Sequence, residues 1–525
     1  MPVGEHADEL ASDQARPIPP RYWWLKRILL AAGVLILALA ALRWWWGWEA
    51  ERRLEAKIAE YRAAGQPVTI EDFQSSPIPD DENAAVLLRK AAAAIVTPSN
   101  SPITPGDVCG SLTVVANWAD EVRALIEANA SALRLARDAR LEPKTDWQIP
   151  LKSPVMNVFF PDLSPQRNLA RLLCAAALYQ HQTASDAAAI EALRDALGQA
   201  RQVGQMRGFL ISHLVTVAID AVAANAIEEL APQLRVAATT GAAPSDSRVA
   251  PPEQVRALIA DLLDEEPIRE QWRWAIYGER LFALDTVTLV ASGRIGPGTL
   301  LVGGGGSSPF GPLAFIAKPM FQLDVVQMME HCTAVARAGT GESYPAACDL
   351  FPEHPRRQPG IEGHARFLSR ILLPSVHRAL ELHFRTIAMR RMAALALAVR
   401  LYEVDHGRRP HSLAELIPEY LSEIPLDPFA AGGRPLGYLP NAPCPILYSV
   451  NLDGVDDGGT YALRESGTVD WDAKDLPFFL DGDRPRQADP RLATRPATTQ
   501  AVEDQSDKVG HGRQTDESQT ADDQP

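Results

Sequence analysis

The chain has 525 residues, of which 46% are hydrophobic and 22% charged, and its formal net charge is −15 at pH 7. This length allows two or three domains, and the composition is that of a folded protein. Nucleic-acid-binding proteins normally present a basic face, so the acidic balance argues against that class, and we expect no nucleic-acid partner.

A membrane helix is predicted over residues 22–48, after a polar, acidic and proline-bearing tail at 1–20 that we expect to be disordered. The stretch 28–42 carries no charged side chain, and tryptophans flank it on both sides, as they do at the two interfaces of a bilayer. A signal peptide cleaved after 38–40 is the alternative, and the tryptophans that follow make it the weaker one.

Basic residues before this apolar stretch favour a cytoplasmic N-terminus: Arg21, Lys26 and Arg27. The chain would then be a single-pass protein of the cell inner membrane, with its bulk in the periplasm. Residues 49–79 are predicted to form a charged helical stalk, ended by Gly65 and Pro67, and an extended linker.

Two stretches of this region carry a resemblance. The pattern Arg53-Leu54-x-x-x-Ile58 and Gly65-x-Pro67-Val68-Thr69 is followed by Pro79-Asp80-x-x-Asn83-Ala84-Ala85. It is similar to a group of bacterial membrane-anchored proteins of unassigned function. The resemblance therefore implies the topology alone.

A helical body is predicted over residues 80–292, and the fold class is expected to be mainly α. Asp80 or Asp81 should cap the first helix, and Asp264-Glu265-Glu266 should form a solvated helix end. Composition and apolar periodicity predict further helices, which we expect to pack as an irregular bundle. They span 112–139, 165–182, 185–205, 209–234, 251–264 and 268–292.

A connector with one helix, at 319–338, is predicted over residues 293–375. Its glycine run at 303–306 lacks the Lys-Ser/Thr of a phosphate-binding loop and is interpreted as a flexible linker. Residues 482–525 are polar and low in hydrophobic side chains, so we predict a disordered tail there.

A long helix followed by a small α+β head is predicted over residues 376–481. Apolar residues recur at helical spacing from Val376 to Glu403, and several arginines fall outside that stripe. Ser412 and Glu415 form a capping-box pattern for a short helix over 413–421. Strands are expected at 436–439 and 446–450, before an acidic, glycine-rich loop.

The head carries a second resemblance. The run Leu401-Tyr402-x-x-Asp405-His406-Gly407-x-x-Pro410 is followed by Ile424-Pro425-x-Asp427-Pro428-Phe429, Tyr448-Ser449 and Asp453-Gly454. This order resembles the C-terminal head of the type II secretion major pseudopilins. The resemblance implies a long helix packed on a small antiparallel sheet, with a loop that binds calcium. In that family the membrane helix directly precedes the long helix, whereas here it lies far upstream, so a borrowed head is implied.

Three carboxylates separated by glycines are suitable calcium ligands: Asp453, Asp456 and Asp457. The resemblance adds Asp470 as a later ligand. Val455 stands where the EF-hand spacing would need an oxygen ligand, and a solvated Asp/Gly turn is the alternative interpretation. The four aspartates are therefore the predicted metal site, for Ca²⁺.

No catalytic motif is recognised, since the sequence contains neither HExxH nor GxSxG. We expect a membrane-anchored structural or interaction protein with protein partners, and an enzyme is the less favoured class. The alternatives are an extracytoplasmic hydrolase whose site residues are dispersed along the chain, and an accessory component of a secretion system.

Overall fold

The structure is a computed structural model, and the fold it shows is mainly helical. It describes residues 22–74, 76–98, 101–183, 185–239, 246, 248–295, 311–350, 367–482 and 484–485. The predicted tail at 1–20, the glycine run at 303–306 and nearly all of the predicted tail at 482–525 lie outside the described residues.

The membrane helix and the stalk form one continuous helix, α1 (Trp23–Ala63). It is long and apolar enough to cross a membrane, and none of its most apolar window is buried. A second helix, α9 (Leu210–Leu230), lies in a segment that meets the same criteria of length and composition, but 67% of that segment's apolar window is buried. Among the helices that the structure describes, α1 is therefore the one that leaves a long apolar surface uncovered.

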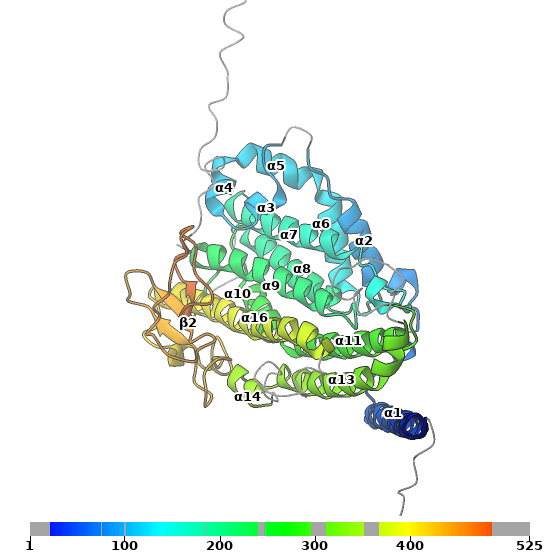
Figure 1. Ribbon diagram of the computed structural model, residues 1–525. Helices are drawn as coiled ribbons and strands as arrows, with labels where there is room; N and C mark the ends of the chain where they lie inside the picture. Colours follow the sequence, from blue (N-terminus) through cyan, green and yellow to red (C-terminus); the bar gives the residue numbers. More distant parts are fainter. Residues whose placement is uncertain are drawn as a thin grey trace, which may run out of the picture.

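The body is a stack of helices that pack on their neighbours in the sequence (Figure 1). Figure 1 shows α4–α6 at one end of the stack, α7–α9 in the middle, and α11 and α13 at the other end. The sheet lies on the opposite side of the molecule from α1. The body helices are α2 (Ala84–Ala93), α3 (Pro105–Val108), α4 (Leu112–Asn117), α5 (Ala119–Ala128), α6 (Ala130–Leu141), α7 (Leu163–Thr183), α8 (Asp186–Val203), α9, α10 (Pro252–Leu263) and α11 (Glu266–Ala291).

The single helix predicted over 112–139 is three helices, α4 to α6. The backbone leaves helical geometry at Trp118 and Asn129. The buried Asn129 side chain accepts from the Val96 N–H and donates to the carbonyls of Val96 and Leu125. A side-chain amide that bonds backbone groups in this way competes with helix continuation. The start of α2 also differs from the prediction. The Asn83 side chain accepts from the N–H of Ala85 and caps this helix, in place of Asp80 or Asp81.

The region predicted as a connector with one helix contains more helix than expected. Helix α13 (Gly311–Ala338) begins before the predicted start, with Pro319 inside it, and α14 (Tyr344–Asp349) is an additional helix. The Ser343 hydroxyl caps α14 by accepting from Ala346, and Pro345 occupies its first turn, where a missing N–H costs nothing.

The long helix α16 (Phe367–His406) runs through the centre of the molecule. It packs against α9, α10 and α13 and also against the strands of the head, so one continuous hydrophobic core includes body and head. The capping box of Ser412 and Glu415 is confirmed, but the helix it starts is a single 3₁₀ turn, Leu413–Leu416.

The head contains a three-stranded antiparallel sheet in the order β1-β2-β3. The two predicted strands are confirmed as β1 (Gly437–Leu439) and β2 (Ile446–Ser449), and β3 (Leu476–Phe479) is an unpredicted third strand. Ile446 pairs with Phe479 in the β2–β3 register. The N–H of Phe479 donates to the buried Glu228 carboxylate of α9 at 2.6 Å, which fastens the sheet to the body.

A buried arginine holds the end of α1 against the body. Arg280 of α11 is fully buried and donates to the carbonyl of Pro67 and the side chains of Gln66 and Thr333. Its guanidinium also lies 4.4 Å from the ring centre of Tyr61. The stalk is therefore fixed to the helical body where it ends.

Candidate functional site

Three of the four aspartates of the predicted calcium site have hydrogen-bond or ion-pair partners of their own. Asp456 accepts from Tyr448 and Gly458 and pairs with Arg434 at 3.0 Å. Asp453 accepts from the N–H of Val455, and Asp470 pairs with Arg464 at 3.3 Å. The structure therefore does not bring the four carboxylates together.

The acidic loop is instead organised by an aspartate that the sequence analysis did not select. Asp475 is buried and accepts from the N–H groups of Gly459 and Asp457. Burial raises the pKa of Asp475 above its usual value. It lies one residue before β3, and because that strand was not predicted, nothing indicated that this carboxylate folds back on the loop.

Among the residues that the structure describes, no group of three or more His, Cys, Asp or Glu side chains is arranged to hold a metal ion. Calcium binding by Asp453, Asp456, Asp457 and Asp470 stays a prediction. For it to occur, Asp456 would have to exchange Arg434 for the ion, because a carboxylate shared with a guanidinium is a weak ligand for a cation.

Residues 401–410 form the junction between α16 and the head. His406 stacks on Tyr402 with ring centres 4.0 Å apart, at the C-terminal end of α16. Asp405 accepts from the N–H of Thr239 in the body and from the Tyr420 hydroxyl in the head. These contacts give Asp405 and His406 structural roles.

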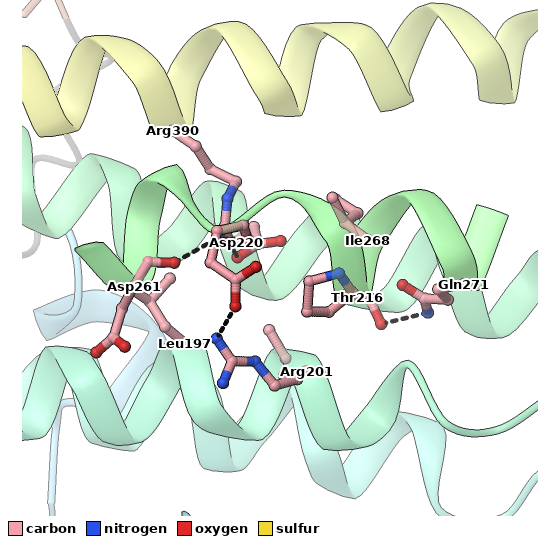
Figure 2. A pocket seen from close by; sticks show the side chains of 11 residues that line it. Leu197, Arg201, Thr216, Asp220, Asp261, Ile268, Gln271 and Arg390 are labelled. Carbon is pink, nitrogen blue, oxygen red and sulfur yellow. Dashed lines mark hydrogen bonds and ion pairs between the residues drawn. The ribbon is translucent and has the colours of Figure 1, made fainter. Parts of the chain in front are cut away.

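A buried cluster of charges joins α16 to α9 and α10 (Figure 2). The Arg390 guanidinium donates to Asp220 at 2.8 Å, and both side chains are nearly inaccessible to solvent. It also donates to the backbone carbonyls of Asp261, Leu262 and Asp264 at the C-terminal end of α10. A cation is favoured there because the last carbonyls of a helix have no partner within it.

The cluster surrounds a cavity of about 20 Å³, which is enough for a single water molecule. Figure 2 shows Thr216 and Gln271 on the side away from Asp261, and their side chains are hydrogen-bonded at 2.8 Å. Burial raises the pKa of Asp220, and Arg390 opposes this rise. The arrangement satisfies its own charges and has room for no substrate, so we interpret it as a structural lock between helices.

The prediction of a solvated acidic end at Asp264-Glu265-Glu266 is wrong for Glu265. Its side chain is 12% exposed and pairs with Arg391 of α16 at 2.6 Å and with Arg269 at 2.7 Å. Burial would raise its pKa, but the two guanidinium groups outweigh burial and hold it below the usual value. Sequence alone could not show that α16 supplies the partner.

The large openings of the described part of the chain include two hollows on either side of the segment 148–152. One holds about 600 Å³ and is bounded by Phe73, Trp147 and Arg207. The other holds about 470 Å³ and is bounded by Arg89 and Phe159. Together we call them the 148–152 groove.

A proline-bearing segment without regular secondary structure over 148–152 forms the floor of this groove. Between α6 and α7 its regular structure is a single 3₁₀ turn, Val155–Asn157. Asp285 holds the segment by accepting from the Ser153 hydroxyl and the Val155 N–H. Phe159 is 78% exposed, and Lys152 is an exposed cation for which no acidic partner is found within the described residues. The groove thus offers an apolar ring and positive charge on its surface.

Two titratable groups in the body have strongly shifted pKa values. Burial raises the pKa of Glu279 in α11 to about 7, although the N–H of Leu210 opposes the rise. Burial lowers the pKa of His213 in α9 to about 4, and Gln271 opposes that shift. His213 is enclosed by the rings of Trp272 and His383. We interpret it as a neutral core residue.

These two pKa shifts predict that the free energy of unfolding changes with pH in opposite directions. Between pH 4.5 and 7 the folded chain keeps a proton on Glu279 that the unfolded chain releases, so the free energy of unfolding falls as pH rises. Between pH 4 and 6.5 the unfolded chain protonates His213 and the folded chain does not, so the free energy of unfolding rises with pH.

Replacing Glu279 by Gln isolates the first contribution. The stability of Glu279→Gln relative to the natural chain should increase from pH 4.5 to 7.5 by up to about 3 kcal/mol, at roughly 1.4 kcal/mol for each unit of pKa shift. Urea unfolding of the detergent-solubilised chain across this range measures it. Two stability profiles that run parallel with pH would show that Glu279 is not buried as described.

No protein-family model, no curated protein and no solved structure matches this chain.

Proposed function

We propose that this protein is a membrane-anchored structural or interaction protein. The observation that carries the proposal is the most apolar window of α1, none of which is buried against the rest of the described chain. An apolar surface of this length is stable when lipid covers it. The basic residues before the apolar stretch support a single-pass topology in the cell inner membrane, with body and head in the periplasm.

The position of the head supports its display away from the membrane. Figure 1 places the sheet across the molecule from α1. The packing of α16 on β2 and β3, a long helix against a small antiparallel sheet, supports a pseudopilin-like head. A role as an accessory of a secretion system rests on that likeness alone.

The 148–152 groove supports an interaction with another protein. An extended partner segment can lie in the groove and place an apolar side chain against Phe159. Lys152 and Arg207 line the same side of the groove, so acidic side chains on the partner would be complementary to it. We therefore propose an extended, acidic protein segment as the occupant.

Charge reversal tests this occupant in cells. A photo-crosslinking amino acid at position 159 should give a protein adduct whose yield falls about tenfold when Lys152→Glu and Arg207→Glu are combined, because each reversal removes an attraction of roughly 0.7 kcal/mol. Arg134→Glu is the matched control, since Arg134 is exposed on α6 outside the groove. An adduct alone does not identify an acidic partner, so the comparison between the two charge variants is the test. Equal yields from the two charge variants would contradict an acidic partner.

A further inference from the structure

Helix α13 lies beside α1 and runs in the same direction. A Cβ atom placed on Gly47 would lie 3.9 Å from the ring of Pro319, and further along Lys57 pairs with Glu330 at 3.0 Å. These two contacts are ten residues apart on α1 and eleven on α13, so the helices run side by side over this length. Gly47 immediately precedes Trp48, the last tryptophan of the second cluster that flanks the apolar stretch.

The joint between the two helices is fixed by buried contacts. Tyr61 and Val68 pack with Met329 in a small hydrophobic cluster. The Tyr61 side chain is hydrogen-bonded to Thr333, which also accepts from Arg280. These contacts set the direction of α13 relative to α1, so the start of α13 can be placed relative to the membrane.

The first two turns of α13 extend past Gly47 toward the apolar part of α1. The helix begins at Gly311, eight residues before Pro319, which is about 12 Å of helix. From Gly311 to Ala317 the sequence has no charged residue, and Lys318 follows. Ile316, in the second turn, is 55% exposed.

We propose that the first two turns of α13 form a second membrane contact, seated in the interface beside α1. The occupant of this surface is lipid: these turns lie beside α1, whose most apolar window is uncovered, exposed Ile316 is at the level of a tryptophan cluster, and Lys318 stands where its ammonium group reaches the headgroups. This contact rests on the proposed membrane span of α1. It limits how the body tilts on the bilayer, because a contact beside α1 holds one side of the body at the interface.

Spin labels on the full chain in liposomes test the proposal. The labels are attached to Ile316→Cys, Leu37→Cys or Ile211→Cys in a background in which Cys109, Cys348 and Cys444 are serine. Leu37 is 70% exposed in the middle of the apolar stretch, and Ile211 is 48% exposed on the body, which makes it the matched control. Collision rates with oxygen, which partitions into lipid, and with a water-soluble nickel complex report the surroundings of each label.

We expect the ratio of oxygen to nickel collisions at position 316 to be several-fold above that at 211 and below that at 37. A ratio at 316 equal to that at 211, with 37 still in lipid, would overturn the second contact and leave the anchor intact. A label at 316 that is shielded from both reagents would show that protein covers this surface, which also contradicts the proposal. Water exposure at 37 would mean that the anchor itself fails.

Discussion

Replacement of Arg390 by alanine is expected to lower the free energy of unfolding by about 3–5 kcal/mol, because it leaves the buried carboxylate of Asp220 without a counter-charge. It also removes the donors for three carbonyl groups at the end of α10. Urea unfolding of the detergent-solubilised chain, followed by circular dichroism, measures the loss.

The matched control is Arg201→Ala. Arg201 pairs with Asp264 in the same cluster, but both side chains are nearly half exposed, so the loss should be at most about 1 kcal/mol. Asp220→Asn should cost less than Arg390→Ala, because Arg390 keeps its backbone carbonyl partners. Equal losses from Arg390→Ala and Arg201→Ala would refute the structural lock.

The pH dependence provides an independent check on the same pair. Burial raises the pKa of Asp220 even with Arg390 present, and removal of the guanidinium would raise it further. A protonated Asp220 needs no counter-charge. The deficit of Arg390→Ala should therefore shrink as the pH falls and be largest at neutral pH and above.

The sequence predicted the helical elements best where their signals are local. The apolar periodicity and flanking residues of 165–182, 185–205 and 251–264 gave α7, α8 and α10 to within a few residues. The capping box at Ser412 was found for the same reason, since its two side chains are three residues apart. Local patterns fail where a distant side chain intervenes, as Asn129 shows by bonding to Val96.

Strand β3 shows a second limit. Leu476-Pro477-Phe478-Phe479 has no alternation of polar and apolar residues, and its proline argues against a strand when only local sequence is considered. In the structure Pro477 stands opposite Tyr448, and all four residues of the strand are buried. The register with β2 and the Glu228 carboxylate from α9 hold this strand in place, and both are distant in the sequence.

The sequence also could not predict which charged residues pair with one another in the core. The periodicity of α16 shows that Arg390 lies outside the apolar stripe, but it does not show which helix faces it there. Asp220 and the end of α10 meet it only in the folded chain. In the acidic loop the local sequence pattern predicts a metal site, but the structure does not bring its four carboxylates together.

Replacing two leucines in the middle of the apolar stretch of α1 by arginine is expected to release the protein from the membrane. The stretch 28–42 contains nine leucine, isoleucine and valine residues, which favour insertion by about 3–5 kcal/mol together. Leu35→Arg with Leu37→Arg would oppose insertion by about 5–7 kcal/mol, so the sign reverses. Val96→Arg with Leu141→Arg is the matched control, because both residues are exposed on the body.

Extraction of membranes with alkaline carbonate measures this directly, because it releases peripheral proteins and leaves inserted helices in the pellet. The account predicts that the natural chain and the Val96/Leu141 control stay in the pellet, and that the Leu35/Leu37 variant and a chain lacking residues 22–48 appear in the supernatant. Release of the natural chain into the supernatant would contradict a membrane-anchored protein.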